Sequence, residues 1–264
     1  MTASPLARNV ASPCSVRPPG NRKLLMTWSI VAHDPETGAF AVAVTTCAFA
    51  VGAACPFVRS GVGAVSTQSM TNRYLGPAVL DGLARGLSPA AAIEGALATD
   101  EGRGLRQIHA VDRHGRSAAY TGRNCVEWCG DVTSAHVSFA GNMLAGPAVL
   151  ADTYAAFATN HDLKLAERML AALDAGEAAG GDRRGRQSAA LVLTTTEDFP
   201  DINLRVDDHP LPLVELHRLY DIWKRDRAPS LRDQPSKARP SGVTDLDSIE
   251  GRWIRQGLDL RLRR

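Results

Sequence analysis

The sequence predicts an α+β fold, specifically a four-layer α-β-β-α sandwich in which helices cover two stacked antiparallel sheets. Two observations lead to this prediction. Hairpin-like strands are interspersed with pairs of amphipathic helices, an order that suits antiparallel sheets and does not suit a doubly wound parallel sheet. Residues 40–44 are apolar on both faces of their strand, as expected if one face meets a second sheet and the other meets helices.

The first strands are predicted from a turn signal. Residues 34–38 read Asp-Pro-Glu-Thr-Gly, which is typical of a tight turn, and the segments on both sides are rich in strand-forming residues. Segments 27–33 and 39–47 should therefore form a hairpin. Short apolar or alternating runs predict the other strands, at residues 62–68, 105–111, 116–120, 136–140, 187–195 and, as a short strand, 205–207.

Helices are predicted as two pairs and one final segment. Ser88 is a suitable N-cap and Pro89 suits the first helical position, so one helix should begin there. Helical periodicity predicts the others at residues 74–85, 147–158, 163–178 and 212–225. One shared apolar face is formed by Leu165, Met169, Leu170 and Leu173. In the last helix the side chains expected to point inward are Val214, Leu219, Ile222 and Trp223.

The composition is that of an ordinary globular protein. The 264 residues are 44% hydrophobic and 22% charged, and no apolar run reaches the roughly 18 residues of a membrane span. Residues 1–25 and 225–264 are basic, so the part between them is mildly acidic, which argues against a nucleic-acid partner. The odd number of cysteines, five, argues against a disulfide framework. Without a secretory signal pattern, a cytoplasmic location is expected.

Three segments are predicted along the chain. Residues 1–25 lack a hydrophobic period and are expected to be a disordered or misannotated N-terminal extension. Residues 26–224 should form the globular domain, and residues 225–264 a basic linker and tail. Within this tail Leu246, Ile249, Trp253 and Leu260 recur at roughly helical spacing, which fits either a short docking helix or a disordered tail.

Thr27 directly follows Met26 and opens the first predicted strand. If translation starts at Met26, aminopeptidase would remove that residue because threonine is small, and the mature chain would begin with Thr27. An N-terminal threonine carries a hydroxyl nucleophile and its own α-amine base on one residue, and an α-amine has a pKa of about 8. The alternative is an ordinary β-branched strand residue.

Five motifs in order resemble a bacterial family, domain-of-unknown-function family 1028, grouped with the N-terminal-nucleophile (Ntn) hydrolases. The motifs are MTWSIVAHDPETGAFAVAV, GVGAVSTQ, NRYLGP at residues 72–77, GNMLAGP and AGGDRRGRQSAALV. The resemblance covers about residues 26–224. It implies the four-layer sandwich, and superfamily analogy implies cleavage of an amide bond. The 25 residues before Met26 depart from the family's pattern, because a chain that retains them has no α-amine on Thr27.

An Ntn mechanism requires partners for Thr27, and four groups are candidates. Asn142 follows Gly141 at a strand end, where its amide could donate to an oxyanion or simply form a turn. Gln68 and Asn72 could line the substrate site or cap a turn. Asp182 could orient Arg184 as a fork for a substrate carboxylate, or the two could form a structural ion pair at a strand entry.

Two functions are therefore weighed. The first is an Ntn hydrolase that cleaves a C–N bond in a small amide or peptide-like substrate. The second is a catalytically silent Ntn-fold protein used for assembly or ligand binding. In both cases a homo-oligomer is expected, with no membrane partner. Cys125 and Cys129 are spaced like half of a metal site, but no second Cys or His pair completes it, so no metal or cofactor is expected.

Overall fold

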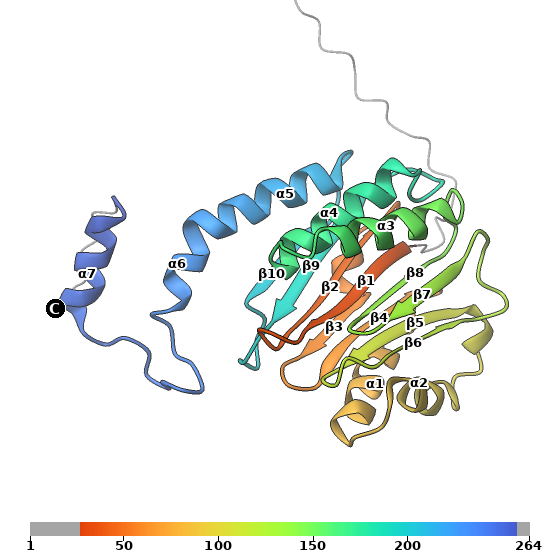
Figure 1. Ribbon diagram of the computed structural model, residues 1–264, viewed down its shortest axis with the longest axis horizontal. Coiled ribbons are helices and arrows are strands. Elements are labelled where there is room, and N and C mark those ends of the chain that lie inside the picture. The colour runs from red at the N-terminus through yellow and green to blue at the C-terminus, as the bar shows by residue number, and fades with distance from the viewer. Residues whose placement is uncertain (1–26, 258–264) are drawn as a thin grey trace, which may run out of the picture.

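The computed structural model describes residues 27–257, so the predictions for residues 1–25, Met26 and Leu260 lie outside the described residues. The described chain has a mixed α+β fold with two antiparallel sheets and helices (Figure 1). The six-stranded sheet has the order β10-β9-β2-β1-β8-β7, and the four-stranded sheet has the order β3-β4-β5-β6.

The six-stranded sheet is built around the N-terminal hairpin of β1 (Thr27–Asp34) and β2 (Ala39–Thr46). The predicted turn forms: Asp34 accepts bonds from the Glu36 amide and the Thr37 hydroxyl, and Gly38 has a φ of 70° that glycine adopts easily. The other strands of this sheet are β7 (Gly130–Ser134), β8 (Val137–Gly141), β9 (Ser188–Thr194) and β10 (Ile202–Val206).

The four-stranded sheet consists of β3 (Pro56–Arg59), β4 (Gly63–Ser69), β5 (Arg106–Asp112) and β6 (Ser117–Thr121). The edge strands β3 and β7 are additional to the strands predicted from the sequence. Both are short, and β7 (GDVTS) is too polar for a hydrophobic pattern to mark it as a strand.

Side chains alternate between two apolar environments along the strands. Ile30 and Ala32 of β1 pack in a core with the helices α3, α4 and α5, whose bounds are given below. Val31 packs instead with Phe40 and with Val111 of the other sheet. The latter contacts join the inner faces of the two sheets. On the outer face of the four-stranded sheet, a separate core is formed with the first helix pair.

The first helix pair is α1 (Leu75–Ala84) and α2 (Pro89–Leu97), and α2 begins as predicted because the Ser88 hydroxyl accepts a bond from the Ala91 amide. The second pair is α3 (Ala148–Thr159) and α4 (Leu165–Ala178). All four apolar residues predicted to share one face of α4 are buried. Figure 1 shows the two pairs on opposite sides of the sheets.

The predicted inward face of α5 (Pro212–Ile222) is partly wrong. Val214 is 63% exposed, and the buried side chains are instead Leu213, Leu216 and Tyr220. These three share one face by their spacing, and they pack in the core beneath β9 and β10. Apolar residues occur on several sides of this helix, so periodicity alone permits more than one orientation.

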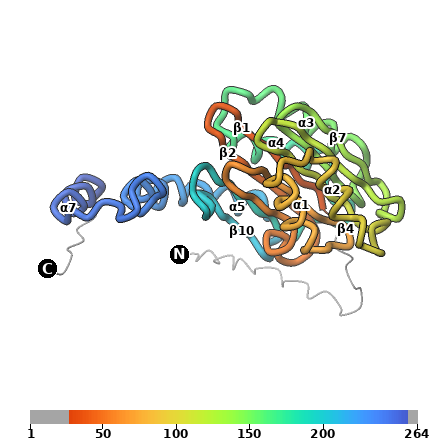
Figure 2. The backbone as a smooth tube through the Cα atoms, turned by 90° about the horizontal axis from the view of Figure 1, so that it is seen from below, coloured from red at the N-terminus to blue at the C-terminus, as the bar shows by residue number. Residues whose placement is uncertain are grey.

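Beyond α5 the chain forms an arm that leaves the sheets (Figures 1 and 2). It comprises a π-helical turn (Trp223–Arg227), α6 (Ala228–Leu231) and, after an irregular segment, α7 (Leu246–Arg255). Arg252 of α7 pairs with Asp233 at 2.9 Å. The sequence of this region fits either a docking helix or a disordered tail, and the structure shows a helix over these ten residues. Across residues 27–257, no helix has the length and apolar character needed to cross a membrane.

Candidate functional site

Thr27 lies at the start of β1, in the interior of the six-stranded sheet. It pairs with Thr46 of β2 on one side, and on the other side its carbonyl oxygen accepts the Asn142 amide at 3.0 Å. The residue is only 2% exposed. Asn142 directly follows β8, so its position opposite Thr27 is set by the pairing of β1 with β8.

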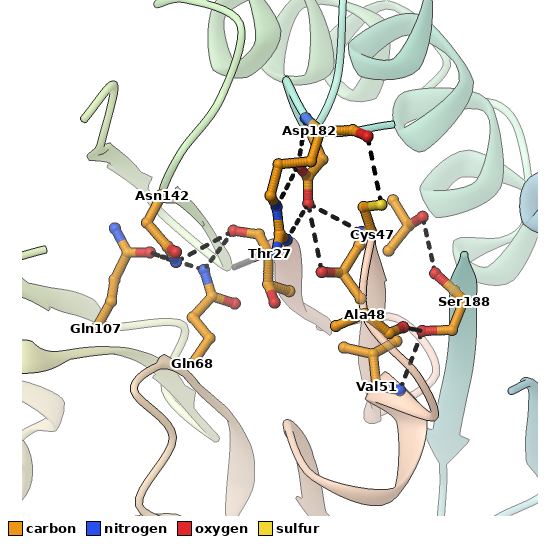
Figure 3. Close-up of polar contacts among 12 residues, drawn as sticks. Thr27, Cys47, Ala48, Val51, Gln68, Gln107, Asn142, Asp182 and Ser188 are labelled. Atoms are coloured by element: carbon orange, nitrogen blue, oxygen red, sulfur yellow. Dashed lines mark hydrogen bonds and ion pairs between the residues drawn. The ribbon is translucent and has the colours of Figure 1, made fainter. Parts of the chain in front are cut away.

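The Thr27 carbonyl oxygen is held by two side-chain amides as well. Asn142 Nδ2 and Gln68 Nε2 each donate to it at 3.3 Å (Figure 3). Both amides also donate to Gln107 Oε1, at 2.8 and 2.9 Å. Because Nδ2 of Asn142 already has two acceptors, it is not available to donate to an oxyanion, and the role weighed for it from the sequence does not fit this geometry.

Gln107 of β5 is the residue of this cluster that sequence reasoning missed. Its Nε2 donates to the carbonyl oxygens of Gly141 and Gly130 and to the Thr121 hydroxyl. The side chain therefore connects the two sheets next to Thr27. A signal was present in the sequence, since polar residues alternate with apolar ones where the sheets face each other. These alternating residues are Thr27 and Ser29, Ser66 and Gln68, and Gln107 and His109.

The same polar network contains an arrangement that resembles a serine–histidine dyad. Ser29 Oγ lies 2.7 Å from His109 Nε2, and His109 Nδ1 lies 3.0 Å from Ser138 Oγ. All three residues are fully buried, and burial lowers the pKa of His109 to about 3. Such a histidine is a very weak base, so we assign this network a structural role.

The Thr27 side chain contacts a different set of residues. Burial raises the pKa of the Cys55 thiol to about 12, and hydrogen bonds with Thr71 and Thr27, together with the charge of Arg73, act in the opposite direction. The Cys55 thiol is therefore a neighbour of the Thr27 side chain and of the Thr71 side chain. It stays protonated at neutral pH and does not compete with the threonine hydroxyl as a nucleophile.

Asp182 lies at the same end of the sheet as Thr27. Its Oδ2 accepts the Cys47 amide at 2.9 Å and the hydroxyl of Thr46, the β2 partner of Thr27, at 3.5 Å (Figure 3). Arg184 binds the same carboxylate through Nε at 3.0 Å and a terminal nitrogen at 2.6 Å. Since two donors of the Arg184 fork are committed to Asp182, the geometry favours the structural ion pair over a carboxylate-binding fork.

A surface cavity of about 850 Å³ borders the other side of the Asp182 loop. Its lining includes Asp182, Arg183 and Arg186, and Arg186 forms an ion pair with Glu177. Within residues 27–257, no group of three or more His, Cys, Asp or Glu side chains is placed to hold a metal ion, at this cavity or at any other position.

The structure does not bring the Asn72 side chain to the Thr27 cluster. Its Nδ2 donates to Asp100 at 2.9 Å, and its Oδ1 accepts the Tyr74 amide. Asp100 also binds Arg106, and the hydrogen bond from Arg106 lowers the pKa of Asp100 to about 2. Asn72 therefore holds the loop between β4 and α1 in place, which is the capping alternative weighed from the sequence.

Comparison with known proteins places the chain in a family. The family model described as a family of unknown function, DUF1028, matches residues 27–216. The chain belongs to this family. A crystal structure of protein SPO2555 from Silicibacter pomeroyi, assigned to the same DUF1028 family, is similar to it with a TM-score of 0.77 and 34% sequence identity. That similarity covers 83% of this chain and 96% of the Silicibacter protein.

A second solved structure, Anbu (ancestral beta-subunit) from Yersinia bercovieri, is a distant match. Its TM-score is 0.35 at 10% identity, covering 80% of this DUF1028 protein and 99% of Anbu. No curated protein matches the sequence.

Proposed function

We propose that this DUF1028 protein is an N-terminal-nucleophile hydrolase that cleaves a C–N bond in a small amide or peptide-like substrate, with Thr27 as the nucleophile. The observation that carries the proposal is the convergence of side chains from both sheets on the first residue of β1. Two side-chain amides and a main-chain amide fix its carbonyl, while its side chain lies beside the Cys55 thiol. In this proposal residues 26–224 form the catalytic domain, with the helix pairs and sheets as a four-layer α-β-β-α sandwich.

In the proposed reaction, Thr27 Oγ attacks the substrate carbonyl carbon and its proton passes to the α-amine of the same residue. The tetrahedral intermediate collapses by breaking the C–N bond, and the leaving nitrogen takes the proton. The product at this stage is an ester between the acyl group and Thr27. Water, activated by the α-amine, then hydrolyses the ester and restores the free threonine.

Asn142 receives a new role in this proposal, as the residue that orients the α-amine. Its Oδ1 is buried and has no hydrogen-bond partner among the described residues, although a buried acceptor normally has one. The amide cannot be turned around, because Nδ2 faces two acceptors, Thr27 O and Gln107 Oε1. An N–H of the α-amine on Thr27 would supply the missing donor from the neighbouring strand, since Asn142 lies next to Thr27 across the β1–β8 pair.

The low exposure of Thr27 supports the second candidate, a catalytically silent protein that binds a ligand or assembles. A nucleophile that is 2% exposed must gain access to a substrate before it can react. In a silent protein the same residue would be an ordinary buried strand threonine.

A pair of proteins that differ by one residue separates the two functions. One is released from a fusion so that it begins at Thr27, and the matched control keeps one glycine before Thr27. We expect only the first to hydrolyse members of a broad panel of amides and dipeptides, because only it has the α-amine base. Equal rates for the two proteins would overturn the mechanism, and a lack of turnover by both would favour the silent protein.

A further inference from the structure

A cavity of about 700 Å³ lies at the end of β1 opposite to Thr27. Two hairpin turns form one side of it, residues 34–37 after β1 and residues 134–137 between β7 and β8. The end of α3, the connection from α3 to α4 and the first turn of α4 form the other side. A ligand in this cavity would therefore be separate from the substrate of Thr27.

The hairpin side of the cavity is built around two histidines that contact each other. His33 is only 9% exposed, and its ring stacks on Phe40 with a centroid distance of 4.6 Å. Its Nδ1 lies 3.1 Å from Nδ1 of His136, and its main-chain amide donates to the His136 carbonyl at 2.8 Å. Because these contacts join the two turns, this wall of the cavity is preorganised.

The helical side of the cavity carries two positive charges, on Arg168 and Lys164. Arg168 Nε donates to the Phe157 carbonyl at 2.6 Å, and the guanidinium lies over the Phe157 ring, 3.7 Å from its centroid. These contacts orient the half-buried Arg168, and burial lowers its pKa below the ordinary value. Within residues 27–257 neither cation has a carboxylate within ion-pair distance, although a partly buried arginine is usually paired.

The carboxylates that line the same cavity are engaged elsewhere or exposed. Asp34 serves its own turn, where its two oxygens accept a main-chain amide and a hydroxyl. Asp162 lies 3.4 Å from Nε2 of His161. Glu36 is exposed on the turn after β1. The two cations on the helical side are thus the charges best placed to bind a ligand of opposite sign.

Apolar side chains provide further contact surface in the cavity. Tyr154 of α3 is 37% exposed, and its ring is held edge-on against Phe139, with a centroid distance of 5.6 Å. Leu163, in the connection from α3 to α4, is 41% exposed. A ligand with an apolar group would remove this surface from water, which favours binding.

We propose that this cavity binds a small organic anion. Arg168 and Lys164 hold its carboxylate or phosphate group, and its apolar part packs against Tyr154. The planar guanidinium can donate two parallel hydrogen bonds to either oxyanion, and the lysine adds a point charge. The eight-residue strand β1 separates this site from Thr27 by roughly 23 Å, so ligand binding here does not depend on the hydrolase mechanism.

The test is isothermal titration calorimetry with benzoate, phenyl phosphate and the neutral analogue benzamide, at constant ionic strength so that screening of surface charges is equal. We expect at least one anion to bind about tenfold or more tightly than benzamide, and the tighter anion identifies the oxyanion that the site prefers. Arg168→Lys should weaken that anion by about tenfold, because it keeps the charge and loses the paired hydrogen bonds. Lys164→Ala should weaken it by about threefold.

Arg85→Ala is the control, since Arg85 is an exposed arginine that follows α1, and it should bind the anions as the wild type does. Lys164 is exposed, so its replacement decides the test if thermal unfolding shows that Arg168→Lys is not folded. A loss of affinity in either variant that is absent from Arg85→Ala supports the site. Benzamide binding as tightly as both anions, no binding of either anion, or affinities that both variants leave unchanged would overturn the proposal.

Discussion

Thr27→Ala is expected to abolish amide hydrolysis, with a fall in kcat of about three orders of magnitude or more, because it removes the attacking oxygen. The fold should persist. The main-chain contacts of Thr27 do not involve its side chain, and loss of the hydroxyl contact with Cys55 should cost only about 1 kcal/mol of the free energy of unfolding. Thr27→Ser should retain partial activity, since it keeps both the hydroxyl and the α-amine.

A suitable control for Thr27→Ala is Thr45→Ala. Thr45 is also a buried strand threonine, and its hydroxyl donates to the Ser188 carbonyl at 3.1 Å instead of facing Cys55. Hydrolysis of the amide panel and thermal unfolding would be measured for each variant. A Thr27→Ala protein that turns over at the wild-type rate, or a Thr45→Ala protein that loses as much activity while still folded, would contradict the assignment.

The second large effect concerns stability in acid. Burial lowers the pKa of His109 from its ordinary value of 6.5 to about 3, so the folded chain excludes a proton that the unfolded chain binds between these values. The free energy of unfolding should therefore fall as the pH is lowered from 6.5 towards 3, by about 1.4 kcal/mol per pH unit from this residue. At pH 7 the contribution is small, because His109 is mostly neutral in the unfolded chain and neutral in the folded one.

His109→Gln should remove this part of the pH dependence. Urea unfolding at pH 7 and at pH 5 gives the loss of stability for each protein, and we expect the loss to be smaller by about 2 kcal/mol in His109→Gln than in the wild type. His161→Gln serves as the control, because the His161 side chain is 70% exposed. Identical losses in the wild type and His109→Gln would show that His109 does not resist protonation.

Local sequence signals predicted the parts of the fold that depend on neighbouring residues. The turn at residues 34–38 forms through the Asp34 side chain, and the helix α2 begins through the Ser88 cap, as their sequences predict. The strand β7 could not be predicted in this way, since it is stabilised by pairing with β8 and not by its own apolar pattern. The orientation of α5 likewise depends on which side the sheet covers.

The sequence predicted the neighbours of Thr27 only where their positions at strand ends place them on adjacent strands. Thr27 and Asn142 meet because one begins β1 and the other follows its neighbour β8. Gln107, from the other sheet, contacts the two side-chain amides that hold the Thr27 carbonyl, and Cys55 lies beside Thr27 from the segment that precedes β3. The stacking of two sheets is not encoded in any short motif. The Asn72 side chain binds the Asp100 carboxylate, and Arg184 binds the Asp182 carboxylate. The sequence does not reveal that these internal carboxylates occupy the groups that could otherwise bind a substrate.

The identity of the first residue in the protein isolated from its own host tests the central claim most directly. Intact-mass analysis combined with N-terminal sequencing would determine it without any knowledge of the substrate. The account predicts a chain that begins at Thr27 with a free α-amine. A mature chain that retains residues before Thr27, such as Arg17 to Lys23, would lack the base on which the proposed mechanism depends and would contradict it.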